Sequence, residues 1–328
     1  MKKEGFRMKR LVGLMLVLCC ALVLGGFGSA TLAADELTFY VIAHAGPGDP
    51  FWAVVQRGVQ DAGKALGVRA IFQGPAGYNV PEQVAMFRAA IEAKADGIAT
   101  TISDARAWAE PIKEARKRGI PVIAINCKEP EELRGTIPYM AYIGMDEYEA
   151  GKMAARQLLP KLKKGARVVV AIHQAGHVGL EARAKGITEV ITQELGGKVD
   201  KLDITQDATQ AIGILRSYLK ANPDTAAIFT LGPLGAIPTI KMIRDDGLKG
   251  KVLMVSFDLD PTVIQAISDG ICEGTVDQQQ YLQGYMAVVE LYLCAKYKLN
   301  PADYDTGRGF VTAETADAVA SLVKQGYR

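Results

Sequence analysis

The sequence predicts an α/β fold with two doubly wound parallel-sheet (Rossmann-like) domains, and three observations predict it. Short apolar runs alternate with longer segments in which apolar residues recur at helical spacing, as in parallel sheets whose strands are joined by right-handed crossover helices. This alternation starts near residue 37 and begins again near residue 141. No Pro- or Ser-rich linker separates the two units, which favours hinged domains with a ligand between them.

The first unit begins with an apolar strand over 37–44. A helix follows, because Phe51, Val55 and Val59 recur at helical spacing after Pro50, a residue that suits the first turn of a helix. The same patterns predict strands over 68–72, 97–102 and 121–126 and helices over 80–91 and 110–118.

The second unit repeats the alternation over a longer stretch. The predicted strands span 141–144, 167–173, 198–204, 226–231, 252–257 and 274–277. The predicted helices span 148–162, 178–195, 208–219, 235–245, 261–269, 281–297 and 313–325.

The first 34 residues have the three-part layout of a secretory signal peptide. Residues 2–10 are basic, an unbroken apolar stretch spans 11–24, and small residues follow as far as Ala34. Cleavage is expected after Ala33 or Ala34, and export would place the protein in the periplasm or otherwise outside the cytoplasmic membrane. Leu18 before Cys19 is unlike the small residue that precedes a lipoprotein cysteine, so lipid attachment is disfavoured, whereas an uncleaved anchor stays open.

The charge balance gives no reason to expect nucleic acid or an anionic membrane surface as a partner. The 328 residues include 38 basic and 36 acidic ones, and five of the basic and one of the acidic residues lie in the first 34, so 33 basic and 35 acidic residues remain. A near-neutral net charge provides no overall attraction to the phosphate backbone of a nucleic acid or to an anionic membrane. Three cysteines lie beyond residue 34, and an odd number in an exported protein leaves at least one free thiol.

The carboxyl ends of the predicted strands supply the candidate site residues, because open parallel sheets bind ligands at that edge. The candidates there are residues 44–52, with His44, Asp49, Phe51 and Trp52 among them, then Asn126, Cys127, Lys128, His173, Gln174, His177, Gly232, Pro233, Asp258, Leu259, Asp260, Gln278, Gln279 and Gln280. These residues are largely aromatic rings and neutral hydrogen-bonding groups. The set therefore suits an uncharged ligand.

Three kinds of side chain in or near this set suit a polyhydroxylated ring. The indole of Trp52 packs well against the C–H face of such a ring. Asn126, Asp258 and Gln278 offer donors and acceptors to hydroxyls, and Arg183 offers a planar fork for vicinal oxygens. Core packing is the alternative for the aromatic residues, and a helix cap or an ion pair is the alternative for the polar ones.

A nucleotide cofactor is disfavoured. Gly46 and Gly48 follow the first strand like the start of a dinucleotide-binding turn, but the third glycine is absent. Asp49 places a carboxylate where the helix begins, and that carboxylate would repel phosphate. We expect no cofactor.

Metal binding and catalysis are disfavoured as well. His173 and His177 are four residues apart, but Gln174 replaces the glutamate of a zinc-protease helix. Cys127 has no histidine beside it in the sequence, although His44 could approach it across the sheet edge. We therefore expect no metal, no catalytic residue and no enzymatic activity.

Several segments in order resemble the periplasmic sugar-binding proteins of the ribose/galactose type, the solute receptors of bacterial ABC importers. The segments are "FYVIAHAGPGDPFWAVVQRGVQDAGKALGV", "ADGIATTISD", "RKRGIPVIAINC", "YIGMDEYEAGKMAA", "AIFTLGPLGA", "VSFDLDP" and "EGTVDQQQYLQGYMAV". "FQGP" and "GPLGAIP" also resemble the related autoinducer-2 receptors. The resemblance covers essentially all of the chain after the signal.

The resemblance implies sugar-binding roles residue by residue. The positions that match the family's sugar contacts are Asp49, Phe51, Trp52, Arg183, Asp258 and Gln278. Asn126 and Cys127 stand where ribose receptors have Asp-Arg, and Gly232 stands where they have Asn. These departures argue against a ribose pocket.

The resemblance also implies the type I periplasmic binding fold, in which two lobes are joined by a three-strand hinge. The lobes would comprise 35–143 plus 278–308 and 144–277 plus 309–328, with hinge segments near 142–144, 276–278 and 308–311. A monomer that closes on its ligand is expected.

We therefore expect an extracytoplasmic solute-binding protein of an ABC importer, which binds a monosaccharide or polyol and delivers it to the membrane permease subunits. A sensory receptor for a sugar-like or autoinducer-2-type ligand is the alternative. A secreted hydrolase or oxidoreductase is a third reading, and no nucleophile–base set supports it. Regulators of the lactose-repressor type share the two-domain core but begin with a helix-turn-helix; here an export signal stands at that end, so DNA binding is disfavoured.

Overall fold

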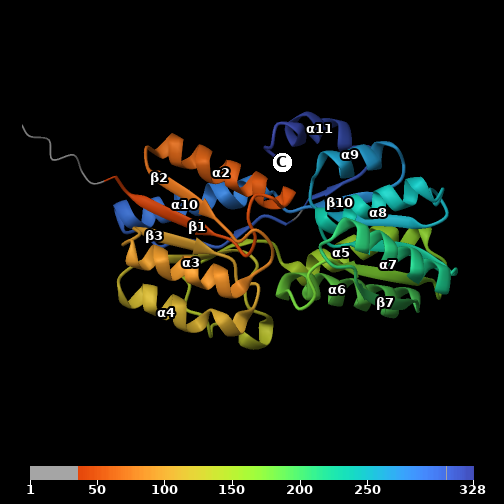
Figure 1. The fold of residues 1–328 in the computed structure, drawn as a ribbon, viewed down its shortest axis with the longest axis horizontal. Coiled ribbons are helices and arrows are strands. Elements are labelled where there is room, and N and C mark those ends of the chain that lie inside the picture. Colours follow the sequence, from red (N-terminus) through yellow and green to blue (C-terminus); the bar gives the residue numbers. More distant parts are fainter. Residues whose placement is uncertain (1–35, 308) are drawn as a thin grey trace, which may run out of the picture. The chain divides into compact units, whose positions relative to one another are not determined.

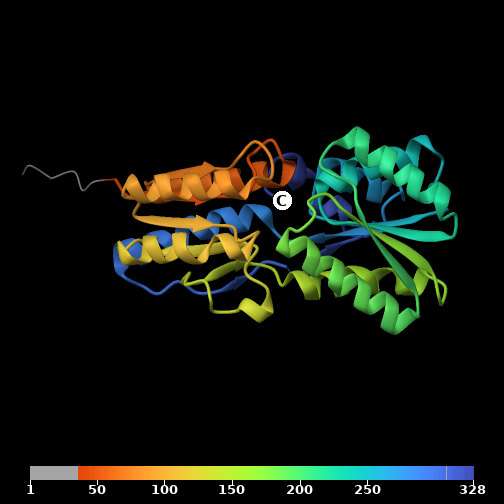
Figure 2. The same cartoon turned by 60° about the horizontal axis from the view of Figure 1, so that its bottom comes forward.

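The computed structural model describes residues 36–307 and 309–328, which form two six-stranded sheets. Each sheet lies between two layers of helices (Figures 1 and 2). The predicted α/β class with two doubly wound sheets is confirmed. The expected signal peptide at 1–34 lies outside the described residues. Within those residues, no helix combines the length and apolar character needed to cross a membrane.

The first sheet has the strand order β11-β5-β4-β3-β1-β2, and all of its pairs are parallel. Its strands are β1 (Thr38–Ile42), β2 (Arg69–Gln73), β3 (Gly97–Thr100), β4 (Val122–Asn126), β5 (Tyr142–Gly144) and β11 (Tyr304–Asp305). Helices α2 (Pro50–Leu66) and α10 (Gln280–Tyr297) share a core on one face, and α3 (Val80–Glu92) and α4 (Ala109–Lys117) share a core on the other. We call this sheet with its helices the first lobe.

The second sheet has the order β12-β10-β9-β8-β6-β7 and forms the second lobe with its helices. Its strands are β6 (Arg167–Ile172), β7 (Lys198–Asp203), β8 (Thr225–Thr230), β9 (Leu253–Phe257), β10 (Gly274–Asp277) and β12 (Gly309–Val311). Helices α5 (Glu147–Leu158) and α6 (Val178–Leu195) cover one face, and the other face carries α7 (Ala208–Ala221), α8 (Pro233–Asp245), α9 (Pro261–Ser268) and α11 (Ala316–Lys324). Strand β12 runs antiparallel to β10. The periodicity of the sequence predicts neither β11 nor β12, because runs of two or three residues show none, but the resemblance places a segment of the three-strand hinge at 308–311, where β12 lies.

The chain passes between the lobes three times, after β5, after β10 and after β11. These passages lie in or next to the predicted hinge segments. The predicted lobe boundaries stay a prediction, because they concern which parts move as units.

Close packing of α5 against α6 depends on two glycines. A Cβ at Gly151 would lie 2.2 Å from the carbonyl oxygen of Arg183, and a Cβ at Gly186 would lie 2.2 Å from the carbonyl oxygen of Tyr148. A main-chain atom cannot yield as the tip of a flexible side chain can, so any larger residue would separate the helices. The packing therefore fixes the backbone position of Arg183, a predicted binding residue.

We expect Gly151→Ala to lower the thermal unfolding midpoint by several degrees, because overpacking of this kind costs about 1–3 kcal/mol. Gly213→Ala is the matched control, since Gly213 is an exposed glycine of α7 whose Cβ would meet nothing within 4 Å. That change should be neutral or slightly stabilising. Calorimetry measures both midpoints, and equal midpoints for the two variants would contradict the packing argument.

Candidate functional site

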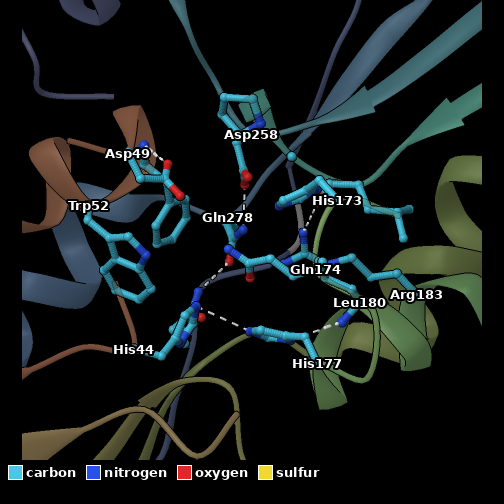
Figure 3. A pocket seen from close by; sticks show the side chains of 15 residues that line it. His44, Asp49, Trp52, His173, Gln174, His177, Leu180, Arg183, Asp258 and Gln278 are labelled. Carbon is cyan, nitrogen blue, oxygen red and sulfur yellow. Dashed lines mark hydrogen bonds between the residues drawn. The ribbon is translucent and has the colours of Figure 1, made fainter. Parts of the chain in front are cut away.

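A cavity with a volume of about 40 Å³ lies between the carboxyl ends of strands from both lobes (Figure 3). Its lining residues are His44, Asp49, Phe51, Trp52, Asn126, His173, Gln174, His177, Leu180, Arg183, Leu231, Gly232, Pro233, Asp258 and Gln278. Eight of the nine predicted binding residues are among them. The structure does not bring Cys127 to the wall: its side chain is fully buried, with Sγ within 4.8 Å of ring nitrogens of His44 and His177.

The start of α2 positions Asp49, Phe51 and Trp52. Asp49 is the N-cap, and its carboxylate accepts a hydrogen bond from the Phe51 main-chain N–H at 3.0 Å. Burial raises the pKa of Asp49 to about 6 despite that hydrogen bond. The Trp52 ring packs edge-on to Phe51 and lies roughly parallel to Phe72 at 6.2 Å. Asp49 therefore caps the helix, as predicted. Phe51 and Trp52 pack in a hydrophobic cluster, as the alternative interpretation holds, and all three residues also line the cavity.

A chain of three polar side chains in the cavity wall joins the lobes. The Asn126 amide donates to the Gln278 Oε1 at 3.2 Å, and the Gln278 amide donates to the Asp258 carboxylate. Asn126 ends β4 and Asp258 directly follows β9, with φ of 63° and 73°, a left-handed conformation that is rare outside glycine. Burial raises the pKa of Asp258 to about 7, although Arg183 and the Gln278 amide oppose the rise. Strained backbone of this kind clusters at functional sites.

Arg183 enters the cavity from α6 as half of a buried ion pair. Its Nε lies 2.5 Å from the Glu147 carboxylate, its Nη1 donates to the Leu231 carbonyl oxygen at 2.7 Å, and both side chains are at most 9% exposed. The guanidinium lies over the Phe257 ring at 4.6 Å. The remaining N–H groups of Arg183 suit a ligand hydroxyl, while Glu147 balances its charge. Burial raises the pKa of Glu147 against the opposing effect of Arg183.

Three buried histidines also line the cavity. His44 Nδ1 lies 3.0 Å from Thr101 Oγ1, and His44 Nε2 lies 3.3 Å from His177 Nε2. His177 is the N-cap of α6, where its Nδ1 accepts from the main-chain N–H groups of Gly179 and Leu180 at 3.0 and 3.3 Å. Neutral His177 therefore carries its proton on Nε2 and donates to His44 Nε2, and His44 donates from Nδ1 to Thr101. Neither ring keeps a nitrogen for a ligand in this arrangement, so a direct ligand contact for His44 stays a prediction.

The third histidine has a free nitrogen. His173 Nδ1 is buried and has no hydrogen-bond partner among the described residues. Burial, together with the nearby charge of Arg183, lowers the pKa of His173 to about 3. A neutral imidazole with an unpaired nitrogen beside the cavity could accept from, or donate to, a ligand hydroxyl.

The potential metal-ligating atoms of His44, Cys127 and His177 lie within 4.8 Å of one another, so a metal site must be considered. The donor chemistry does not fit it. A metal on His177 Nε2 requires the ring proton on Nδ1, but Nδ1 already accepts from two main-chain N–H groups. Burial also raises the pKa of the Cys127 thiol, whereas a ligating cysteine must be a thiolate.

Sequence reasoning missed Glu147, Leu180 and Leu231. Glu147 lies in a quoted segment just after the Asp146 cap, but nothing in that segment shows that α5 packs against Arg183 of α6. Leu180 and Leu231 are apolar residues of a helix start and a strand end, where core packing is the ordinary interpretation.

A comparison with known families matches residues 39–298 to the periplasmic binding protein domain. Among curated proteins, the chain is 29% identical to the xylose/arabinose-binding protein XylF of Sulfolobus acidocaldarius over 276 residues, which are 80% of this chain and 68% of that protein. It is 26% identical to the D-allose-binding periplasmic protein of Escherichia coli, over 82% of this chain and 83% of that protein.

Solved structures give the same picture. A periplasmic sugar-binding protein of an ABC sugar transporter from Legionella pneumophila superposes with a TM-score of 0.78 at 32% identity, covering 83% of this chain and all of that one. A carbohydrate transporter protein from Acidothermus cellulolyticus, solved in complex with myo-inositol, gives a TM-score of 0.80 at 29% identity, covering 89% of this chain and all of that one.

Proposed function

Because the chain belongs to the periplasmic binding protein domain family, we propose that it is the extracytoplasmic solute-binding protein of an ABC importer. It binds a monosaccharide or polyol between its two lobes, 35–143 plus 278–308 and 144–277 plus 309–328. The closed form delivers the ligand to the permease subunits. It acts outside the cytoplasmic membrane, as a monomer and without catalysis.

The observation that carries this proposal is the chemistry of the cavity. Asp258, Gln278 and Asn126 form one hydrogen-bonded chain, and Arg183 keeps free N–H groups while Glu147 neutralises its charge. An aromatic wall lies opposite, at the start of α2. Fixed donors and acceptors beside apolar rings match the alternating hydroxyl and C–H faces of a sugar. The names of the relatives, which bind pentoses, allose or myo-inositol, support the same class.

A thermal-shift screen tests the proposal. The panel contains pentoses, hexoses, deoxysugars, tetritols and inositols, with nucleosides and inorganic anions as controls. A ligand at about 100 times its Kd should stabilise the protein by about 2.7 kcal/mol, which raises the midpoint by several degrees. We expect a sharp response to one sugar or polyol and none to the controls. A flat panel, on protein unfolded and refolded to remove carried-over ligand, would contradict the proposal.

A further inference from the structure

One side of the cavity is closed by a direct contact between the lobes. His44 follows β1 of the first lobe, and His177 begins α6 of the second; their rings meet edge to face, with centroids 4.6 Å apart, and both are nearly fully buried (Figure 3). Beside them, the main-chain N–H of Val178 donates to the carbonyl oxygen of Ser103 at 3.1 Å. Tyr78 faces both rings, with centroids 5.5 and 5.7 Å away.

We propose that His44 and His177 are positioning residues for ligand binding, whose mutual hydrogen bond holds the two lobes together around the cavity. The bond joins Thr101 of the first lobe to the start of α6 through two imidazoles. Neither ring offers a nitrogen to the ligand, so the pair acts on affinity through lobe closure. This role rests on the proposed function, because closure matters to binding only if a ligand is held between the lobes.

The bond requires both rings to be neutral. In His177 the unprotonated nitrogen is Nδ1, and it faces the main-chain N–H groups of Gly179 and Leu180. In His44 the unprotonated nitrogen is Nε2, and it faces the Nε2–H of His177. A proton added to either ring therefore sets N–H against N–H. Consistently, burial lowers the pKa of His44 to about 3 and the pKa of His177 far below its usual value.

Among the described residues, Glu147 is the carboxylate that packs near the pair; its Oε2 is held by Arg183, and its Oε1 has no hydrogen-bond partner. The titratable or charged groups that pack near the two histidines are Tyr78, Cys127, Glu147, His173 and Arg183. Arg183 and His173 oppose a further positive charge, and Glu147 pairs with Arg183. When the lobes separate, water reaches the rings and their pKa should return toward the ordinary value of about 6.5. Acid therefore favours the open form. Because protonation breaks the hydrogen bond between His44 and His177, ligand affinity should decrease as the pH is lowered.

Three substitutions test the hydrogen bond between His44 and His177, called the bridge below, while they preserve the neighbouring structure. His177→Asn keeps an acceptor for the α6 cap but is too short to reach His44. His44→Asn likewise keeps a group near Thr101 and loses the bridge. His177→Gln places an uncharged N–H near the position of Nε2 and cannot be protonated. Calorimetric titration measures Kd at pH 7.5 and 5.0 for D-xylose, D-arabinose, D-ribose, D-allose and myo-inositol.

At pH 7.5 we expect each asparagine variant to raise Kd about tenfold, because a buried hydrogen bond is lost. The double variant should be no weaker than either single one, since both remove the same bond. Between pH 7.5 and 5.0, Kd should rise at least tenfold more in the parent than in His177→Asn. His177→Gln should recover affinity at pH 7.5 and retain the shallow pH profile.

His173→Asn is the control, because it removes a buried histidine of the same cavity that is outside the bridge. Its effect should add to that of His177→Asn. Additive effects of His44→Asn and His177→Asn, or equal pH profiles in the parent and His177→Asn, would overturn the bridge. If no compound binds the parent, the proposed function fails. In that case small-angle scattering tests the hydrogen bond between His44 and His177. A radius of gyration that increases from pH 7.5 to pH 5.0 only in the parent supports the proposal. An equal increase in His177→Asn overturns it.

Discussion

Asp258→Ala is expected to weaken ligand binding by at least about a hundredfold. The Asp258 carboxylate holds the Gln278 amide with one oxygen, and its other oxygen lies beside Gly232 at the cavity wall. Its loss leaves ligand hydroxyls buried without an acceptor and frees Gln278 from its position. Hydrogen bonds to charged groups contribute about 1.5–3 kcal/mol each, so two of them give this factor. Calorimetric titration with the compound that binds the parent measures it.

The control for this result is Asp269→Ala, which removes an exposed carboxylate that pairs with Arg244 outside the cavity. Its Kd should equal that of the parent. Parent-like binding by Asp258→Ala would show that the ligand lies elsewhere.

The same carboxylate gives two opposite pH trends. Burial raises the pKa of Asp258 to about 7. For the ligand-free protein, a folded pKa above the unfolded value means that this group contributes stability below about pH 4, and the contribution is lost as the pH rises through 7. Ligand hydroxyls donate best to the ionised carboxylate, so its contribution to affinity should rise between pH 6 and 8. Asp258→Asn should remove both trends, and denaturation and titration series across this range measure them.

The edge of the sheet on which the cavity lies could be predicted, because topology alone determines it. Parallel strands place their carboxyl ends together, so Asp49, Asn126 and Asp258 could be selected from a reading of where strands end. The helix cap at Asp49 could also be predicted, because an aspartate directly before a proline is a local signal for the start of a helix.

What the sequence could not supply is contact between elements far apart in the chain. Glu147 reaches Arg183 only because glycines let α5 and α6 approach closely. His44 and His177 are 133 positions apart in the sequence, and a separation of that length gives no indication that the two side chains are in contact. Cys127 comes directly after Asn126, the last residue of β4, yet its side chain is buried away from the cavity wall, because the left-handed turn at Asn126 redirects the chain there.

Arg183→Leu is expected to destabilise the protein by about 3–5 kcal/mol, which corresponds to a fall of roughly 10 °C in the thermal midpoint. The cause is the partner left behind. Glu147 is buried, and its Oε1 already has no hydrogen-bond partner among the described residues. Without Arg183 it must remain a buried lone charge or take up a proton. The matched control is Arg156→Leu, since Arg156 and Glu194 form an exposed pair between the same two helices, and such pairs contribute at most about 1 kcal/mol.

Arg183→Leu combined with Glu147→Leu separates the two roles of this ion pair. Removing both charges replaces a desolvated pair with apolar groups, which is often neutral or stabilising, so the midpoint should recover most of the loss. Ligand binding should not recover, because the free N–H groups of Arg183 at the cavity wall are gone. A double variant as unstable as Arg183→Leu would show that the loss came from packing against Phe257. A double variant that binds normally would remove Arg183 from the binding site and leave it a structural residue of α6.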